Sequence, residues 1–247
     1  MPNDNLTIAW VYPDLLSTYG DQGNVAVLAG RARSRGIPVE ILQIRSGRSI
    51  PASADIYMLG GGEDRAQELA SDRLRADPGL RRAADAGRVI MGVCAGYQLL
   101  GTRFLGHDGR THAGAGILDV RSHRLEQRAT GELLGEVDPE LNLPEITGFE
   151  NHHGSTALGP GARPLARTIV GYGNGDGSEG AYQGSVLATY MHGPALARNP
   201  ALADLLLTWA TGSTLSSIDD TWMEKMRDER LHHLGYSRSG RQTELSG

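Results

Sequence analysis

The sequence predicts an α/β protein in which a mostly parallel central sheet is flanked by helices and the second half adds antiparallel strands. Short apolar runs alternate with helical patterns through the first hundred residues, and this alternation is typical of βαβ units. This alternation predicts a parallel sheet that helices cover on both faces. The 247 residues, 39% of them hydrophobic, suffice for one sizeable domain. We expect it over residues 1–212, followed by a polar helix and flexible tail at 213–247.

The elements of the first half are predicted in order. The strands of the central sheet are expected at residues 6–11, 39–44, 55–59, 88–93 and 186–190. The intervening helices are expected over about 22–34, over 65–86 with an interruption near Pro78, and from Tyr97 onward. Asp21 or Asn24 is the candidate N-cap of the first helix, because short polar side chains accept hydrogen bonds from the free N–H groups of a helix start.

The second half has a different pattern. From Gly114 to about Val170 the sequence predicts short strands and turns, and residues 171–180 form a glycine-rich loop. An amphipathic helix is expected at 199–210 and a polar helix at 219–234, with a disordered end.

Composition excludes several classes of function. A net charge of −5 argues against nucleic-acid binding, which needs a broad basic face. Cys94 is the only cysteine, so no intramolecular disulfide forms and a reducing, cytoplasmic location is expected. No apolar run has the length of a membrane span or of a signal peptide core. The only lysine, Lys225, lies between Glu224 and Met226, so the chain has no Walker-type phosphate loop.

Cys94 is the candidate nucleophile. It stands in Gly92-Val-Cys-Ala-Gly96, between a predicted buried strand and a predicted helix, which is the arrangement of a nucleophile elbow with cysteine in place of serine. The flanking glycines relieve crowding in the sharp turn, the helix N-terminus favours the thiolate, and the amide of Ala95 is placed to stabilise an oxyanion. A lone cysteine is otherwise most often a buried structural residue.

Three consecutive glycines, Gly60 to Gly62, follow another predicted strand. Loops at the carboxyl ends of parallel strands form the ligand crevice of such sheets, and glycine lets backbone amides approach a substrate closely. We expect an amide of Gly61 or Gly62 to be the second oxyanion donor. The alternative is an ordinary flexible turn.

His192 is the favoured base among eight histidines. It follows a predicted strand and precedes Gly193-Pro194, which end the element and fix the ring at the sheet edge. His152 and His153 are the rivals, and the residues alone favour His192 only modestly over this pair.

These motifs carry a family resemblance. GVCAGYQ at 92–98, GGGED at 60–64 and YMHGP at 190–194 together resemble the class I (triad-type) glutamine amidotransferases, in particular the cobyric-acid-synthase-like branch. Within that branch, YPDLLSTYGDQGN at 12–24 and GFENHHG at 148–154 resemble the glutaminase subunits of lipid II isoglutaminyl synthases. The resemblance runs from about residue 6 to 210 and implies the class I amidotransferase fold.

The resemblance implies a reaction and a partner. The chain would hydrolyse L-glutamine and pass ammonia to a Mur-ligase-like synthetase subunit in a heterodimer. That subunit, using ATP and Mg²⁺, would amidate the α-carboxyl of D-glutamate in lipid II for peptidoglycan synthesis. No cofactor or metal is expected on this chain. Arg128 matches the arginine that binds substrate and guards the entrance in this subfamily, and an arginine can hold a carboxylate bidentately.

One position departs from the wider family. Most class I members carry glutamate two residues after the histidine, where this chain has Pro194. Proline cannot orient an imidazole, so we expect a Cys94–His192 dyad whose third group is missing or comes from the partner.

Two alternatives stay open. The same elbow would serve a glutaminase subunit of another amidotransferase, or a stand-alone cysteine amidohydrolase. A non-catalytic interaction subunit that kept the fold is less favoured, because the cysteine and histidine motifs are intact.

Overall fold

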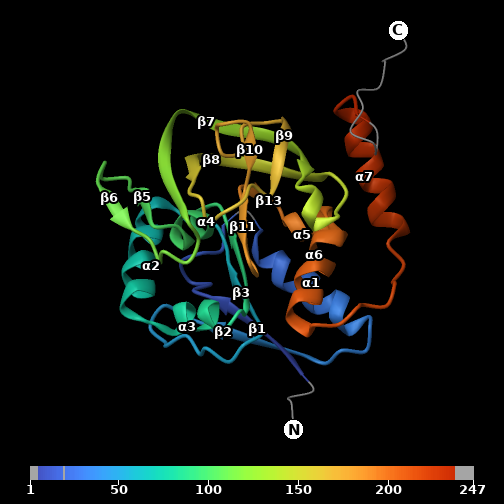
Figure 1. Ribbon diagram of the computed structural model, residues 1–247, viewed down its shortest axis with the longest axis horizontal. Helices are drawn as coiled ribbons and strands as arrows, with labels where there is room; N and C mark the ends of the chain where they lie inside the picture. The colour runs from blue at the N-terminus through green and yellow to red at the C-terminus, as the bar shows by residue number, and fades with distance from the viewer. Residues whose placement is uncertain (1–4, 19, 237–247) are drawn as a thin grey trace.

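The computed structural model describes residues 5–18 and 20–236 (Figure 1). Its central sheet has six strands in the order β11-β12-β4-β3-β1-β2. The bounds are β1 Leu6–Val11, β2 Val39–Ile44, β3 Ile56–Leu59, β4 Val89–Val93, β11 Ala181–Gln183 and β12 Val186–Thr189. All neighbours pair in parallel except β11 with β12. The five predicted strands and the mostly parallel sheet are therefore confirmed.

Helices cover both faces of this sheet, as Figure 1 shows. Their bounds are α1 Gln22–Arg33, α2 Asp64–Ala76, α3 Gly79–Asp85, α4 Ala95–Leu100, α5 Ala195–Arg198, α6 Pro200–Thr211 and α7 Thr221–His233. Apolar side chains of α2, α3 and α4 form one core against the sheet, and those of α1 and α6 form the other. None of the helices among the described residues is long and apolar enough to cross a membrane.

A second, mostly antiparallel sheet lies over the carboxyl ends of the central strands (Figure 1). Its strands are β5 Arg103–Leu105, β6 Thr111–Ala113, β7 Val120–Val137, β8 Ile146–Leu158, β9 Ala166–Val170, β10 Ser178–Glu179 and β13 Met191–His192, with the 3-10 turn η1 Pro139–Leu141 after β7. The added antiparallel strands are confirmed, but the expectation of short strands was wrong for β7 and β8. A bulge between Arg124 and Ala129 interrupts their register and hides the two-residue alternation of a long strand.

Four segments meet where the central strands end. The loop after β1 carries the stretch from Tyr12 to Asp21, β3 runs into the three glycines, β4 runs into Cys94, and β12 leads to β13 with His192. Strand order places β12, β4, β3 and β1 side by side. The candidate residues are thereby gathered at one edge of the sheet, as parallel strands require.

The polar helix expected near the C-terminus is α7, and it is fastened to the body of the protein. Arg31 on α1, with a side chain 4% exposed, holds Asp204 of α6 at 2.7 Å and Asp220, just before α7, at 2.6 Å. Leu231 of α7 is buried. The flexible tail was predicted on residues that include 237–247, which lie outside the described ones.

Replacing Arg31 by alanine is predicted to destabilise the fold by about 3 kcal/mol, because Asp220 loses this buried partner while Asp204 keeps only Arg35. The control is Arg33→Ala on the same helix, which is exposed and should change the free energy of unfolding by less than about 0.5 kcal/mol. Urea unfolding measures both. Equal effects of the two substitutions would contradict the anchoring role of Arg31.

Candidate active site

Cys94 occupies a strained backbone turn between β4 and α4. Its φ of 52° and ψ of −103° lie in a region that residues other than glycine rarely adopt. The N–H of Cys94 donates to the carbonyl of Thr189 at 2.9 Å, and the N–H of Gly96 donates to that of Gly60 at 3.1 Å. These bonds hold the turn between its two neighbouring strands.

The two glycines of the turn are required by packing. A Cβ at Gly92 would lie 2.7 Å from Cδ1 of Leu100, and one at Gly96 would lie 2.5 Å from the carbonyl oxygen of Leu59. Neither site has room for a side chain. The geometry agrees with the role that the sequence analysis gave these glycines in a nucleophile elbow.

His192 faces Cys94 and is 1% exposed. Burial lowers the pKa of its imidazole, but the hydrogen bond with Asp21, the hydrogen bond with Cys94 and the charges of both together raise the pKa to about 10. The ring is therefore an imidazolium at neutral pH, paired with a carboxylate on one side and the sulfur on the other.

Asp21 is the third group of this cluster, and sequence reasoning missed it. Nδ1 of His192 lies 3.1 Å from both carboxylate oxygens of Asp21, whose side chain is fully buried. We expected a Cys94–His192 dyad whose third group is missing or comes from the partner. That expectation was wrong, because Asp21 of this chain bonds His192. Asp21 was considered only as a helix cap. It does stand at the N-cap position of α1 but makes no capping hydrogen bond, because its side chain turns to His192 instead.

The carboxylate of Asp21 also fixes the glycine loop. The N–H of Gly61 donates to Oδ2 of Asp21 at 2.7 Å, so this amide points away from the pocket and does not serve as an oxyanion donor. A Cβ at Gly61 would lie 2.8 Å from Cε1 of His192. Gly61 therefore lets the loop approach the histidine and the aspartate, and not a substrate as predicted. Gly62 lines the pocket beside Cys94 and is left as the candidate donor.

A pocket opens in front of Cys94. Its walls come from the glycine loop and α2, from the elbow, from the β5–β6 hairpin and from β7 and β8: Gly62, Glu63, Asp64, Gln67, Cys94, Ala95, Gln98, Leu105, Gly106, His107, His123, Arg124, Arg128, Asn151, His152, His153 and Gly154. Ala95 is the first residue of α4, so its N–H has no partner within the helix. Gly62 and Ala95 line the pocket together with Cys94.

Arg128 is an exposed residue on the far wall of this pocket. It sits in the bulged part of β7, and its Nε donates to Oδ1 of Asn151 on β8. Arg124, also in the bulge, lines the same wall. The two guanidinium groups give the pocket a positive side suited to a carboxylate.

The rival histidines have other partners. His152 is buried, with Nδ1 2.8 Å from the carbonyl of Gly154 and Nε2 3.2 Å from Glu150. Its ring stacks on Tyr190, with centroids 3.9 Å apart. His152 is therefore a structural core residue. His153 lines the pocket, where burial and the charges of Arg124 and Arg128 lower its pKa.

A buried acid supports the strand that carries His192. Glu179 accepts hydrogen bonds from the hydroxyl of Thr189 and the N–H of Tyr190. Burial raises its pKa to about 7, against the effect of these hydrogen bonds. The sequence did not identify Glu179. It lies in a glycine-rich segment that reads as a loop, and no motif there marks a buried acid.

The sequence matches a family model described as a CobB/CobQ-like glutamine amidotransferase domain over residues 7–200. It is 37% identical over 206 residues to the subunit GatD of a lipid II isoglutaminyl synthase (glutamine-hydrolyzing) from Staphylococcus aureus strain N315, covering 82% of this chain and 83% of the relative. The corresponding subunit of Streptococcus pneumoniae strain R6 is 32% identical, over 83% of this chain and 80% of the relative. A cobyric acid synthase of Sphingopyxis alaskensis is 37% identical over 68% of this chain but only 34% of its own length.

Solved structures agree on the fold. A crystal structure of a glutamine amidotransferase superposes with a TM-score of 0.58 at 21% identity, covering 84% of this chain and 100% of that one. A glutamine amidotransferase from Thermotoga maritima gives a TM-score of 0.53 at 16% identity, covering 92% and 88%. At these identities the likeness shows the fold alone, and it matches the fold class predicted from the sequence.

The pairing of Asp21 with His192 predicts a pH-dependent stability. Because the pKa of His192 is raised from 6.5 to about 10, the stabilisation is fully present below pH 6.5 and is lost as the pH rises through about 10. Asp21→Asn should therefore cost more free energy of unfolding at pH 6.5 than at pH 10. Urea unfolding at the two pH values tests this.

The control is Asp14→Asn. Asp14 lies in the same segment and bonds Ser46, and its pKa is lowered, so its effect should not change over this pH range. A cost of Asp21→Asn that stays constant from pH 6.5 to 10 would contradict the paired imidazolium.

Proposed function

Because the chain belongs to the family of CobB/CobQ-like glutamine amidotransferase domains, we propose that it is the glutaminase subunit of a lipid II isoglutaminyl synthase. The observation that carries the proposal is the cysteine in a strained elbow, facing a histidine that a buried carboxylate holds. This arrangement performs acyl transfer from an amide. The similarity to two GatD subunits over more than four fifths of the chain supports the choice of system.

The first half of the reaction forms a thioester. The Cys94 thiolate attacks the side-chain carboxamide carbon of glutamine, and the amides of Gly62 and Ala95 hold the oxyanion. The imidazolium of His192 gives its proton to the departing nitrogen, so ammonia leaves and the ring becomes neutral. The raised pKa of His192 supplies this acid at neutral pH.

The second half hydrolyses the thioester. Neutral His192 takes a proton from water, and the hydroxide attacks the thioester carbon. Collapse of the intermediate releases glutamate and restores the Cys94 thiolate beside the imidazolium. Asp21 keeps the ring oriented and stabilises its charged form. The cluster thus acts as a triad whose acid comes from the segment before α1.

Arg128 is proposed to hold the α-carboxylate of the substrate. Its guanidinium stands on the pocket wall formed by β7 and β8 and is oriented by Asn151. A planar guanidinium binds a carboxylate in a fixed geometry. It would place the far end of glutamine, its carboxamide, next to Cys94.

The ammonia is proposed to pass to a Mur-ligase-like synthetase subunit, which amidates the α-carboxyl of D-glutamate in lipid II. ATP and Mg²⁺ would act on that subunit, and the glutaminase reaction needs no cofactor on this chain. The lack of a phosphate-loop lysine here supports this division. A heterodimer on the cytoplasmic side, serving cell-wall synthesis and cell shape, is the arrangement we propose.

A second candidate is the glutaminase part of another amidotransferase. The similarity to a cobyric acid synthase over 68% of this chain supports it. The two candidates differ in the acceptor of ammonia and not in the chemistry at Cys94. Glutamine-dependent amidation of lipid II by the chain and its partner separates them.

Cys94→Ala is predicted to abolish amidation that uses glutamine while sparing amidation that uses ammonium chloride. The substitution removes the nucleophile of this chain and leaves the ATP chemistry of the partner intact. The chain is co-expressed with the Mur-ligase-like subunit, and amidated lipid II is measured with each nitrogen source in the presence of ATP. A thiol-reactive glutamine analogue should label the native chain and not the variant. Glutamine-dependent product from Cys94→Ala would rule out the nucleophile.

Arg128→Ala is predicted to raise KM for glutamine by about 10- to 100-fold, the equivalent of about 1.5–3 kcal/mol for a charge-assisted hydrogen bond, with a small effect on kcat. The control is Arg121→Ala, which is exposed on the same strand and outside the pocket. Steady-state glutaminase kinetics measure both. An unchanged KM in Arg128→Ala would remove this residue from substrate binding.

A further inference from the structure

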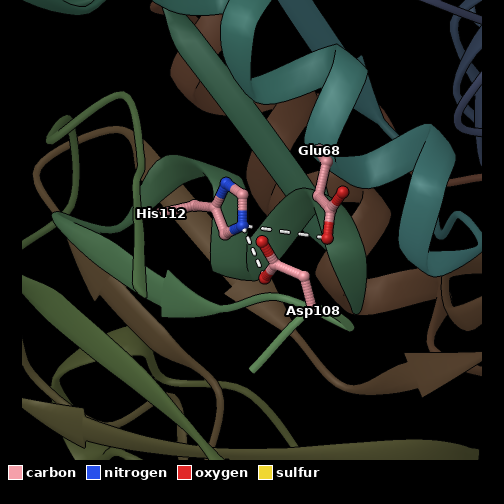
Figure 2. Close-up of side chains that lie close together, drawn as sticks. All are labelled: Glu68, Asp108 and His112. Carbon is pink, nitrogen blue, oxygen red and sulfur yellow. Dashed lines mark hydrogen bonds and ion pairs between the residues drawn. The ribbon is translucent and has the colours of Figure 1, made fainter. Parts of the chain in front are cut away.

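Three side chains with metal-binding atoms converge beside the pocket of Cys94. Figure 2 shows Glu68 of α2 pointing toward Asp108 and His112 of the β5–β6 hairpin. Nε2 of His112 lies 3.1 Å from Oδ1 of Asp108 and 3.7 Å from Oε1 of Glu68. One atom of each residue falls within 4.8 Å of the others. Asp108 and His112 are four residues apart, but Glu68 lies far from both in the sequence, and no metal site was predicted.

We propose that Glu68, Asp108 and His112 bind a divalent transition ion of the Zn²⁺ class. Bonds of about 2.0–2.2 Å from a tetrahedral ion to nitrogen and oxygen place neighbouring ligand atoms about 3.3–3.6 Å apart. The two separations at His112, 3.1 and 3.7 Å, bracket that spacing. The carboxylate oxygens of Glu68 and Asp108 lie within 4.8 Å of each other, so an ion would draw these two side chains together around the nitrogen of His112.

Neighbouring groups hold each of the three side chains in a fixed orientation. The ring of His112 stacks on Phe104, with centroids 5.5 Å apart. The backbone N–H of His107 donates to Oε1 of Glu68 at 3.2 Å, and that of Arg110 donates to Oδ1 of Asp108 at 2.9 Å. Such outer contacts fix the direction of metal ligands.

The space itself depends on a glycine. A Cβ at Gly106 would lie 2.6 Å from Nε2 of His112 and 2.7 Å from Oε1 of Glu68. Any other residue at this position would therefore push the imidazole and the carboxylate out of place. The hairpin keeps the one residue type that leaves both ligand atoms where they are.

The ligand set selects the class of ion. One imidazole nitrogen with two carboxylates suits Zn²⁺ and its neighbours, whereas Ca²⁺ and Mg²⁺ prefer oxygen ligands in larger number. The nitrogen that binds the ion is the unprotonated one of the imidazole ring. Three protein ligands leave a fourth position for water.

The position of the site indicates a structural role, in which the ion links α2 to the β5–β6 hairpin. Glu68 belongs to α2, while Asp108 and His112 belong to a hairpin whose residues Leu105, Gly106 and His107 line the pocket. A bound ion joins these two walls at the pocket rim. Binding of the ion does not depend on the function proposed above, and the experiment measures binding.

The test is Zn²⁺ titration of the untagged full chain carrying Cys94→Ala, which removes the only thiolate and with it binding at the nucleophile. Calorimetry should show one Zn²⁺ per chain. Saturating Zn²⁺ should raise Tm. Adding His112→Ala, or Glu68→Gln together with Asp108→Asn, should weaken binding at least about tenfold.

The matched control is His107→Ala. His107 lies in the same hairpin but pairs through its side chain with Asp64 at 3.0 Å, so its loss should leave the affinity unchanged. The double variant Glu68→Gln and Asp108→Asn keeps the shape of both side chains. A loss of binding in this variant is therefore not explained by misfolding of the hairpin. No saturable binding by the Cys94→Ala chain, or equal loss in His107→Ala and His112→Ala, would overturn the proposal.

Discussion

The carboxylate of Asp21 is the contact on which the geometry of the site depends. It accepts from the ring of His192 and from the amide of Gly61, and so ties together three loops that follow different strands. Burying a carboxylate is costly unless its partners satisfy it. Here the partners are an imidazolium and a backbone N–H at hydrogen-bond distance. Because Gly61 lies against His192, any side chain at that position would separate the base from its acid.

The strained turn at Cys94 is the second constraint, and the sheet supports it from both sides. The N–H of Cys94 bonds β12 through Thr189, while the N–H of Gly96 bonds β3 through Gly60. Thr189 is in turn held by the buried Glu179. Thr189, three residues before His192, therefore links the turn at Cys94 to the buried Glu179.

The sequence predicted the central sheet because its strands are short, continuous and apolar, a signal that survives without tertiary information. Cys94 was found for a similar reason, since the glycines around it mark the elbow locally. The long strands β7 and β8 escaped prediction because the bulge between Arg124 and Ala129 breaks the alternation that identifies a strand. The same bulge brings Arg128 to the pocket, so the irregularity that concealed the strand also shapes a wall of the pocket.

Asp21 could not be assigned from the sequence for a physical reason. An aspartate before a helix is a good N-cap, and the local pattern contains nothing that argues for another use. His192 lies 171 positions away, and only the order of the strands brings the two together. A charged histidine in a buried place attracts the carboxylate more strongly than the helix amides do, so the tertiary contact wins over the local one. Pro194, whose presence suggested that no acid was available, packs where a Cβ of Gly23 would lie, 2.6 Å from its Cγ. The segment that replaces the expected glutamate therefore packs against the start of α1, next to Asp21.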